Sequence, residues 1–524
     1  MDIEEFEYSN DINSSDNNYS PQLIHKKKHS KNKSKFKFNF FPNKKITIAI
    51  YSFFLIAATI CIILNLIYNN KINILNSLEN NSKDISNKIP ECDIGYKLEK
   101  DECVINYSFK AIYETYKDIE QIDLARTLSP EMILELIIDG EKQRPNNKFI
   151  FQKKGKHLVY ILLDMDKIDT LENMFSGIIW LSKISFSELF NTEKFNSMKS
   201  MFRNCRALTN IDLSQFRTPN IVNMDLLFSG CTALQDINLN NFSNENLMSI
   251  NRAFFQCTSL GNLDLSNFKT PNLVNMSYTF AECDKLISLD LSGFDTKNVK
   301  NMRGLFDQCK SLVAVNIKNF ETNNVIDMAK MFNECHSLKH LDTSVFKGPK
   351  VTTIKGMFHN CKSIISINLS NFGGESLTEL DNIFEGCTSV EEIDFSNFAP
   401  KNTLKNINYL FFFCTSLTKI NLANFKTEGV ESMNGVFQGC SKLTSVDISS
   451  FDTSQVYTMV DMFNGCSELK EVDITTFDMN KIIHINRMFD GCPKLAQHGI
   501  KINPNTIRKF ERKIPDYYIT IVKN

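Results

Sequence analysis

The chain has 524 residues, enough for several domains or for one long array. Lys and Arg total 59 against 60 for Asp and Glu, so the chain is nearly neutral, and we expect no nucleic-acid partner. The 15 Cys are spread along the chain, which excludes the dense disulfide framework of a short secreted domain.

The N-terminal part predicts a membrane anchor. Residues 1–45 form an expected disordered basic cytoplasmic tail, with nine Lys between Lys26 and Lys45. The run from Ile46 to Tyr68 is apolar and uncharged, so 46–68 is a predicted transmembrane helix. The preceding lysines place the N-terminus in the cytoplasm and the rest outside, on the cell surface or in a lumen, with the tail at the inner leaflet. A cleavable signal peptide and a buried core helix are alternatives.

Residues 69–103 are expected to be a stalk that ends in a short polar loop. Cys92 and Cys103 frame this loop, and an oxidising compartment would favour a disulfide between them. Residues 104–170 predict a small β-rich cap domain, with strands within 104–113, 119–124, 132–142, 147–156 and 157–164. The stretch 138–147 is a candidate hairpin turn, and a helix over 129–138 is the alternative.

Residues 171–495 are an array of repeats. Cysteines recur every 26 residues with one interval of 27, at Cys205, Cys231, Cys257, Cys283, Cys309, Cys335, Cys361, Cys387, Cys414, Cys440, Cys466 and Cys492. An earlier degenerate unit has Ile178 in that position. Each unit alternates as a strand does, then spaces its apolar residues at three and four, which suits a short helix or 3₁₀ turn. The period predicts an α/β, β-rich solenoid of about 12–13 units, closed by a C-terminal cap over 496–524.

Two phenylalanine columns are the expected core of this solenoid. One follows each strand, at Phe216, Phe242, Phe268, Phe294, Phe320, Phe346, Phe372, Phe398, Phe425, Phe451 and Phe477. The other stands three residues before each Cys, from Phe202 through Phe306 to Phe489. Each buried Phe contributes roughly 1.5–3 kcal/mol.

The unit resembles a known repeat. Its pattern MF-x-G-C-x-S-L-x-x-I-D-L-S-x-F-x-T-x-N-V-x-x-M, seen in VFQGCSKLTSVDISSFDTSQVYTM, is similar to the BspA-type leucine-rich repeats of bacterial and protist surface proteins. The resemblance implies a right-handed leucine-rich-repeat coil, displayed on a surface and used for binding or adhesion. The N-terminal span departs from family members that use other export signals.

The repeated cysteines predict a stack of buried thiols. Neighbouring parallel strands are close enough for a disulfide, but side chains in register point the same way, which disfavours disulfide geometry.

A polar column beside the buried residues is the candidate binding face. It comprises Asp212, Asn238, Asp264, Asp290, Asn316, Asp342, Asn368, Asp394, Asn421, Asp447 and Asp473. Carboxylates at strand spacing could hold Ca²⁺, but we favour hydrogen bonding along the column and expect no metal or other cofactor. An inner face on the order of 60 Å long suits a protein or glycan chain better than a small-molecule substrate.

No catalytic motif or metal spacing is present, and we expect no enzyme. His336, His340 and His359 lie in adjacent units and are expected to be surface side chains. Candidate glycosylation sites are Asn80, Asn106, Asn241 and Asn275. The sequence therefore predicts a single-pass surface protein that binds an extracellular protein or glycan. The alternatives are a repeat scaffold facing the cytoplasm and a repeat-bearing enzyme of the secretory pathway.

Overall fold

The computed structural model describes residues 107–243, 245–378, 380–396, 398, 400, 404–495, 499–503 and 519–521. The expected tail over 1–45, the predicted membrane helix over 46–68 and the Cys92–Cys103 pair lie outside these ranges. Within them, no helix has the length and apolarity that crossing a membrane requires.

The cap domain is a β-sheet that merges into the repeat array. Its strands are β1 (Phe109–Thr115), β2 (Glu120–Asp123), β3 (Ile133–Ile138), β4 (Glu141–Gln143), β5 (Lys148–Phe151) and β6 (Gly155–Leu163). Two 3₁₀ turns accompany them: η1 (Pro130–Met132) directly precedes β3, and η2 (Met165–Lys167) follows β6. The main sheet has the order β4-β3-β6-β1-β7-β8-β9, and β2 pairs with β5 separately. Since β1 is antiparallel to β7 and β7 is parallel to β8, the cap covers the first edge of the array.

The hairpin expected over 138–147 is confirmed. β3 and β4 are antiparallel with Ile138 opposite Glu141, which leaves a two-residue turn of Asp139 and Gly140. Their φ angles are 51° and 86°, the pair of left-handed residues that a tight hairpin turn prefers. The alternative helix over 129–138 is wrong, because only η1 precedes the strand β3.

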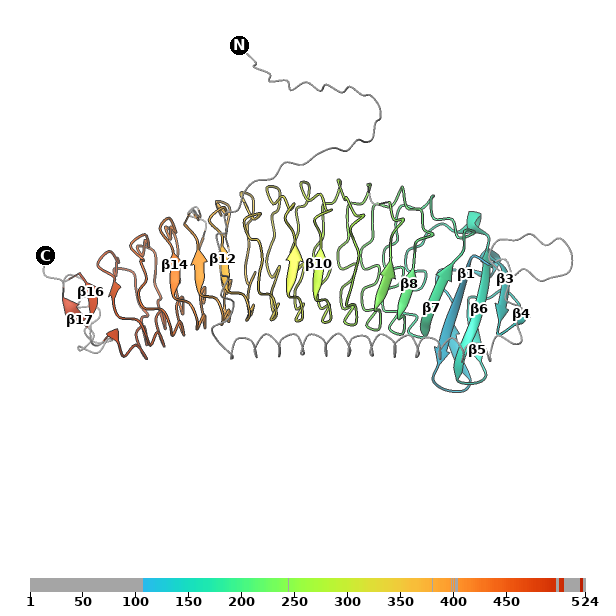
Figure 1. The fold of residues 1–524 in the computed structure, drawn as a ribbon, viewed down its shortest axis with the longest axis horizontal. Coiled ribbons are helices and arrows are strands. Elements are labelled where there is room, and N and C mark those ends of the chain that lie inside the picture. The colour runs from blue at the N-terminus through green and yellow to red at the C-terminus, as the bar shows by residue number, and fades with distance from the viewer. Residues whose placement is uncertain are drawn as a thin grey trace, which may run out of the picture. The chain divides into compact units, whose positions relative to one another are not determined.

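The repeats stack as coils of one solenoid (Figure 1). Short strands recur along one face: β7 (Leu181–Phe186), β8 (Asn210–Asp212), β9 (Asp236–Asn238), β10 (Ser288–Asp290), β11 (Ala314–Asn316), β12 (Ser366–Asn368), β13 (Glu392–Asp394), β14 (Lys419–Asn421) and β15 (Val472–Asp473). Neighbours pair in parallel, as where Leu289 lies opposite Val315. A second ladder of single parallel bridges joins positions such as Asn275, Asn301 and Asp327 in successive coils. The predicted solenoid of 26-residue coils is therefore confirmed.

The predicted helical segment of each unit is wrong. Described residues between 174 and 490 contain no helix; each coil instead returns through overlapping turns. Leu305 N–H donates to the Met302 carbonyl (3.2 Å), whereas the amide of Gly304 donates to Ala329 in the next coil (2.8 Å). Gly304 and Gln308 have φ of 58° and 60°, and left-handed residues of this kind break an α-helix. The array is thus β-only, without the α component that we predicted.

Both phenylalanine columns are buried, as predicted. The column before the cysteines forms an unbroken stack of rings from Phe175 to Phe489, with neighbouring centroids such as Phe306 and Phe332 5.4 Å apart. The rings are nearly parallel; those of Phe332 and Phe358 differ by only 2°. Ile178 is fully buried at the first, degenerate position. The two columns run through one continuous apolar core that extends along the coils.

The parallel sheet continues past the last cysteine. β16 (Ile500–Ile502) pairs in parallel with β15, and β17 (Ile519–Ile521) pairs in parallel with β16. Two further strands therefore follow the coil of Cys492, within the segment expected to be a C-terminal cap.

Candidate functional site

The Asp/Asn column lies at the end of each strand, where its side chains fold back on the backbone. In all eleven units the side-chain oxygen accepts a hydrogen bond from the amide two residues later, as Asp290 Oδ1 does from Ser292 N–H (2.8 Å). This is an Asx turn, which Asp and Asn favour because their short side chains reach that amide. Hydrogen bonds from the hydroxyl and then the amide of the Ser two residues later lower the pKa of the Asp290 and Asp447 carboxyls, and the same two bonds, with the amide first, lower the pKa of Asp264.

The Asx turn explains why this column repeats without invoking a ligand. Among the described residues of this column, the hydrogen bonding expected between neighbouring units is made from Asn316 Nδ2 to Asp290 Oδ1 (3.0 Å). Among the described residues, no three His, Cys, Asp or Glu side chains form a group that could hold a metal ion. A hollow of about 330 Å³ opens beside Asp447 and Asp473 and is lined mostly by small polar residues. As a binding face the column remains a prediction.

Other repeated polar residues tie one coil to the next. Asn side chains after the strand donate to carbonyls of the preceding coil: Asn220 to Glu193, Asn246 to Pro219, Asn272 to Glu245, Asn298 to Pro271 and Asn324 to Lys297. Buried Thr hydroxyls donate to the following coil: Thr218 to Ser243, Thr296 to Glu321, Thr427 to Asp452 and Thr453 to Asp478. These repeated residues build the solenoid, because their hydrogen bonds join each coil to its neighbours.

The twelve repeated cysteines are free, buried thiols, as predicted. Each Sγ–H donates to a Phe carbonyl of the preceding coil, as Cys309 does to Phe280 (3.0 Å). Burial raises the pKa of the Cys283 and Cys387 thiols to about 12. A thiol that stays protonated is a poor nucleophile and metal ligand, so this column has a structural role.

The three neighbouring histidines do not converge on one point. His359 Nδ1 lies 2.7 Å from Asn333 Oδ1, and Nε2 of the same ring lies 3.8 Å from the Glu385 carboxylate. Asn333 Nδ2 in turn donates to Asp307 Oδ1 (2.6 Å), so a chain of polar contacts crosses four coils. His336 has its own environment, in which burial lowers its pKa. The contacts of His359 join coils together and do not assemble a catalytic group.

Two of the four candidate glycosylation sites lie among the described residues. Asn241 is exposed, and its Nδ2 donates to the Ser214 carbonyl (2.7 Å). Asn275 is half-buried, and its Oδ1 accepts from the Ser277 hydroxyl (2.8 Å). Asn80 and Asn106 lie outside the described residues. Glycosylation of Asn241 would therefore have to break the hydrogen bond that its Nδ2 donates to the preceding coil.

An exposed aromatic cluster, formed by Tyr409, Phe412 and Phe413, is the clearest exception to the repeat. The ring centroids of Tyr409 and Phe412 are 5.3 Å apart, and those of Phe412 and Phe413 are 4.5 Å apart, both edge to face. Tyr409 is 39% and Phe413 49% exposed. A Cβ on Gly435 of the next coil would lie 2.6 Å from the Tyr409 ring, so this glycine leaves room for the ring.

Tyr409 and Phe413 occupy two left-handed backbone positions that recur from coil to coil. Tyr409 and Phe413 both have φ of 56°, a conformation that is unfavourable for bulky side chains. Most other coils place smaller or polar residues there, such as Gly435 and Gly439 in the next coil. The left-handed backbone therefore belongs to the repeat, whereas the exposed rings of Tyr409 and Phe413 distinguish this coil. The cluster is therefore a better candidate for ligand contact than the repeated Asp/Asn column.

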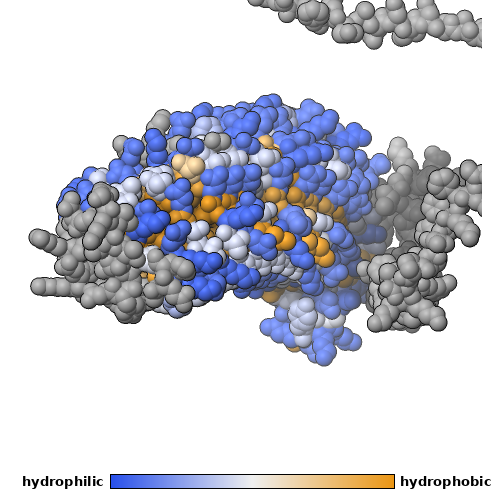
Figure 2. Space-filling view, turned by 60° about the vertical axis from the view of Figure 1, so that its left-hand side comes forward, coloured by the Kyte–Doolittle hydropathy of each residue, from blue (hydrophilic) through white to orange (hydrophobic). Residues whose placement is uncertain are grey.

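The sequence analysis did not single out these three residues. The signal was in the sequence NYLFFFC, where Phe413 occupies a position that is Gly, Asn, Gln or Glu in the other units with a repeated cysteine. Other exposed apolar side chains lie on the array, including Met248, Ile287, Ile326 and Ile483. Figure 2 shows apolar residues gathered in a band across one face of the coils, between hydrophilic residues.

The coils, their parallel ladders and their buried columns define a β-solenoid repeat protein of the leucine-rich-repeat kind. The chain belongs to the family described as "Mycoplasma protein of unknown function, DUF285", whose model matches residues 156–260, 227–344, 274–398, 339–420 and 405–516, together more than half of the chain. None of the curated proteins matches it.

Several solved structures are similar. A leucine-rich repeat protein from Bacteroides ovatus is 20% identical, covers 63% of this chain and 88% of its own, and has a TM-score of 0.34. An internalin from Listeria monocytogenes is 13% identical (50% and 82% covered, TM-score 0.21). The functional domain of InlJ from the same species, which includes a cysteine ladder, is 15% identical (64% and 66% covered, TM-score 0.18). Superpositions this loose carry no argument about function.

Proposed function

We propose that the chain is a BspA-type surface protein, anchored by the apolar segment 46–68, whose solenoid binds a protein or glycan ligand outside the membrane. It acts as a binding protein and not as an enzyme. The basic tail over 1–45 stays on the cytoplasmic side, and the cap and coils extend beyond the bilayer.

The observation that carries the binding role is the aromatic cluster of Tyr409, Phe412 and Phe413. The repeated polar residues are committed to bonds within and between coils, whereas these rings contribute little to the core. Exposed apolar surface on a soluble array marks an interaction site. Aromatic rings suit this role because each presents a large, rigid contact area, to a sugar ring or to an apolar side chain of a protein.

The cluster is expected to dominate ligand binding. Immobilised arrays of glycans and extracellular-matrix proteins would first identify ligands of the purified protein. The variant with Phe412→Ser and Phe413→Ser should then bind the identified ligand at least about 30-fold more weakly, because loss of a contact hot spot costs about 2 kcal/mol or more. Titration calorimetry measures this change.

A matched control separates binding from folding. Met248→Ser and Ile326→Ser alter two apolar side chains that are 49% and 44% exposed elsewhere on the array. This variant should keep wild-type affinity, and both variants should keep the wild-type circular dichroism spectrum. Equal affinity of the cluster variant and the wild type would refute the assignment of the ligand site to the cluster.

A further inference from the structure

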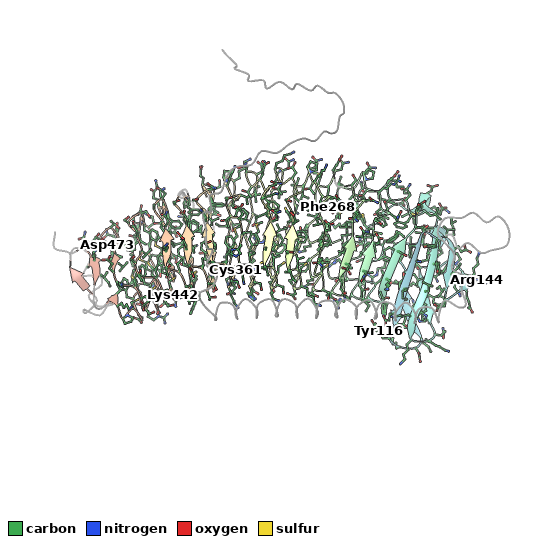
Figure 3. All side chains as sticks on the ribbon, viewed as in Figure 1. Tyr116, Arg144, Phe268, Cys361, Lys442 and Asp473 are labelled. Atoms are coloured by element: carbon green, nitrogen blue, oxygen red, sulfur yellow. The ribbon has the colours of Figure 1, made fainter. Side chains whose placement is uncertain are left out.

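The cap domain ends in an apolar tip made of two adjacent loops, residues 116–119 and 152–154. Tyr116 is 65% and Ile119 70% exposed, the two highest values among the large apolar side chains that the structure describes. Figure 1 shows this end of the cap, below β5, projecting past the edge of the coils, and Figure 3 places Tyr116 there.

The two loops are held together by hydrogen bonds. Ile119 N–H donates to the Gln152 carbonyl (3.3 Å), and Lys154 N–H donates to Asp118 Oδ1 (2.8 Å). Tyr116 N–H donates to the carboxylate of Glu120 (3.0 Å), which is 8% exposed. The tip is therefore a defined shape that presents its apolar side chains outward.

Ile119 occupies the tip at an energetic cost. Its φ of 56° is in the left-handed region, where a β-branched residue is a rare outlier. Its apolar side chain is also exposed to water. Asn or Gly would suit this position better, because both tolerate a positive φ and neither exposes an apolar side chain. A strained residue that also exposes apolar surface indicates a contact made outside the fold.

The charges around the tip are mainly positive. Lys117, Lys153, Lys154 and Lys156 are exposed, and none of them forms an ion pair with another described residue. Asp118 is the exposed carboxylate in the two loops, and its Oδ1 already accepts the Lys154 amide. An apolar point surrounded by lysines matches an anionic lipid surface, whose headgroups attract the lysines while the acyl region accepts the apolar side chains.

We propose that the tip inserts Tyr116 and Ile119 into an anionic bilayer, so that the cap domain rests on the membrane. The lysines of both loops contact lipid headgroups. This contact does not depend on which ligand the coils bind, and it would fix the direction in which the array leaves the membrane.

The test uses the full chain with one tryptophan at the tip. The variant with Tyr116→Trp and Trp180→Phe is combined with vesicles of phosphatidylcholine, alone or mixed with phosphatidylglycerol, whose acyl chains carry bromine. In mixed vesicles the tryptophan emission should shift to the blue and be quenched by bromine. Lys153→Glu and Lys154→Glu together should lower the ratio of inserted to free tip about 30-fold or more, given about tenfold for each 1.4 kcal/mol and about 1 kcal/mol per lysine.

Two controls make the result specific. Tyr457→Trp with Trp180→Phe reports from a coil side chain that is 43% exposed, and it should not be quenched. Lys285→Glu with Lys339→Glu reverses two exposed coil lysines and should leave tip quenching unchanged. Emission from the tip that stays water-like in mixed vesicles would overturn the proposal, and such a surface would then fit a protein partner. Ligand binding by the coils is measured separately, so either proposal can fail alone.

Discussion

Replacement of Phe306 by alanine is expected to lower the free energy of unfolding by about 3–5 kcal/mol. Phe306 is fully buried, and its ring stacks on Phe280 (5.6 Å between centroids) and on Phe332 (5.4 Å). The substitution removes one ring from a continuous stack, and the neighbouring coils cannot close the gap because each is fixed by its backbone bonds.

Urea unfolding followed by circular dichroism measures this effect. Ile287→Ala is the matched control, because Ile287 belongs to the same repeat and is 57% exposed; its effect should stay within about 0.5 kcal/mol. Since coils unfold as neighbours in a one-dimensional array, the loss should be concentrated around the altered coil. An unfolding curve of the Phe306 variant that coincides with the wild type would contradict the buried stack.

Alkaline pH is expected to destabilise the array strongly through the thiol column. A Cys in an unfolded chain titrates near pH 8.5, whereas burial raises the pKa of Cys283 and Cys387 to about 12. For these acids the folded pKa is the higher one, so the unfolded chain releases its protons first. Their contribution to stability is therefore fully present below about pH 8.5 and is lost as pH rises toward 12. At about pH 9.5, each thiol whose pKa is raised by burial costs about 1.4 kcal/mol of stability. Eleven of the twelve repeated thiols have a raised pKa, so their effects add.

The measurement is the urea midpoint at pH 7.5 to 9.5. A steep fall is predicted, and a variant with Cys283→Ala, Cys309→Ala and Cys335→Ala should lose part of the slope. Removing these thiols also leaves small cavities, so the slope and not the absolute stability is compared. A midpoint independent of pH over this range would show that the thiols are not buried as described.

Much of the fold could be predicted because it follows from a repeated pattern. Twelve units average out local ambiguity, so the period, the strand around residues such as Leu289 and the burial of Phe306 could all be predicted. The hairpin at Asp139 and Gly140 could be predicted because few residues tolerate two left-handed positions in succession.

The helical segment could not be predicted correctly, for a physical reason. Met302, Leu305 and Phe306 are spaced as on one face of a helix, but overlapping turns bring the same residues inward. The difference depends on the left-handed backbone at residues 304 and 308, and in many coils those positions are not Gly, so the sequence gives a weak signal. The Asx turns of the Asp/Asn column were not predicted. We expected these side chains to hydrogen-bond to the neighbouring coil, whereas they accept hydrogen bonds from the amide two residues later in their own coil.

The aromatic cluster was missed because sequence analysis favours what repeats. Tyr409, Phe412 and Phe413 add aromatic residues to a chain already rich in Phe, and only the structure separates exposed rings from buried ones. In a repeat protein, the residues that build the scaffold recur, whereas the residues that select a ligand are expected where the pattern is broken.

Protease treatment of intact cells that make the protein tests the central claim, an array displayed beyond the membrane, most directly. Antibodies against the coils and against the tail over 1–45 would follow the two sides separately. Protease treatment of intact cells is predicted to remove the antibody signal of the coils. The antibody signal of the tail should stay until the cells are permeabilised. Coils that survive on intact cells and are digested only after permeabilisation would contradict the account.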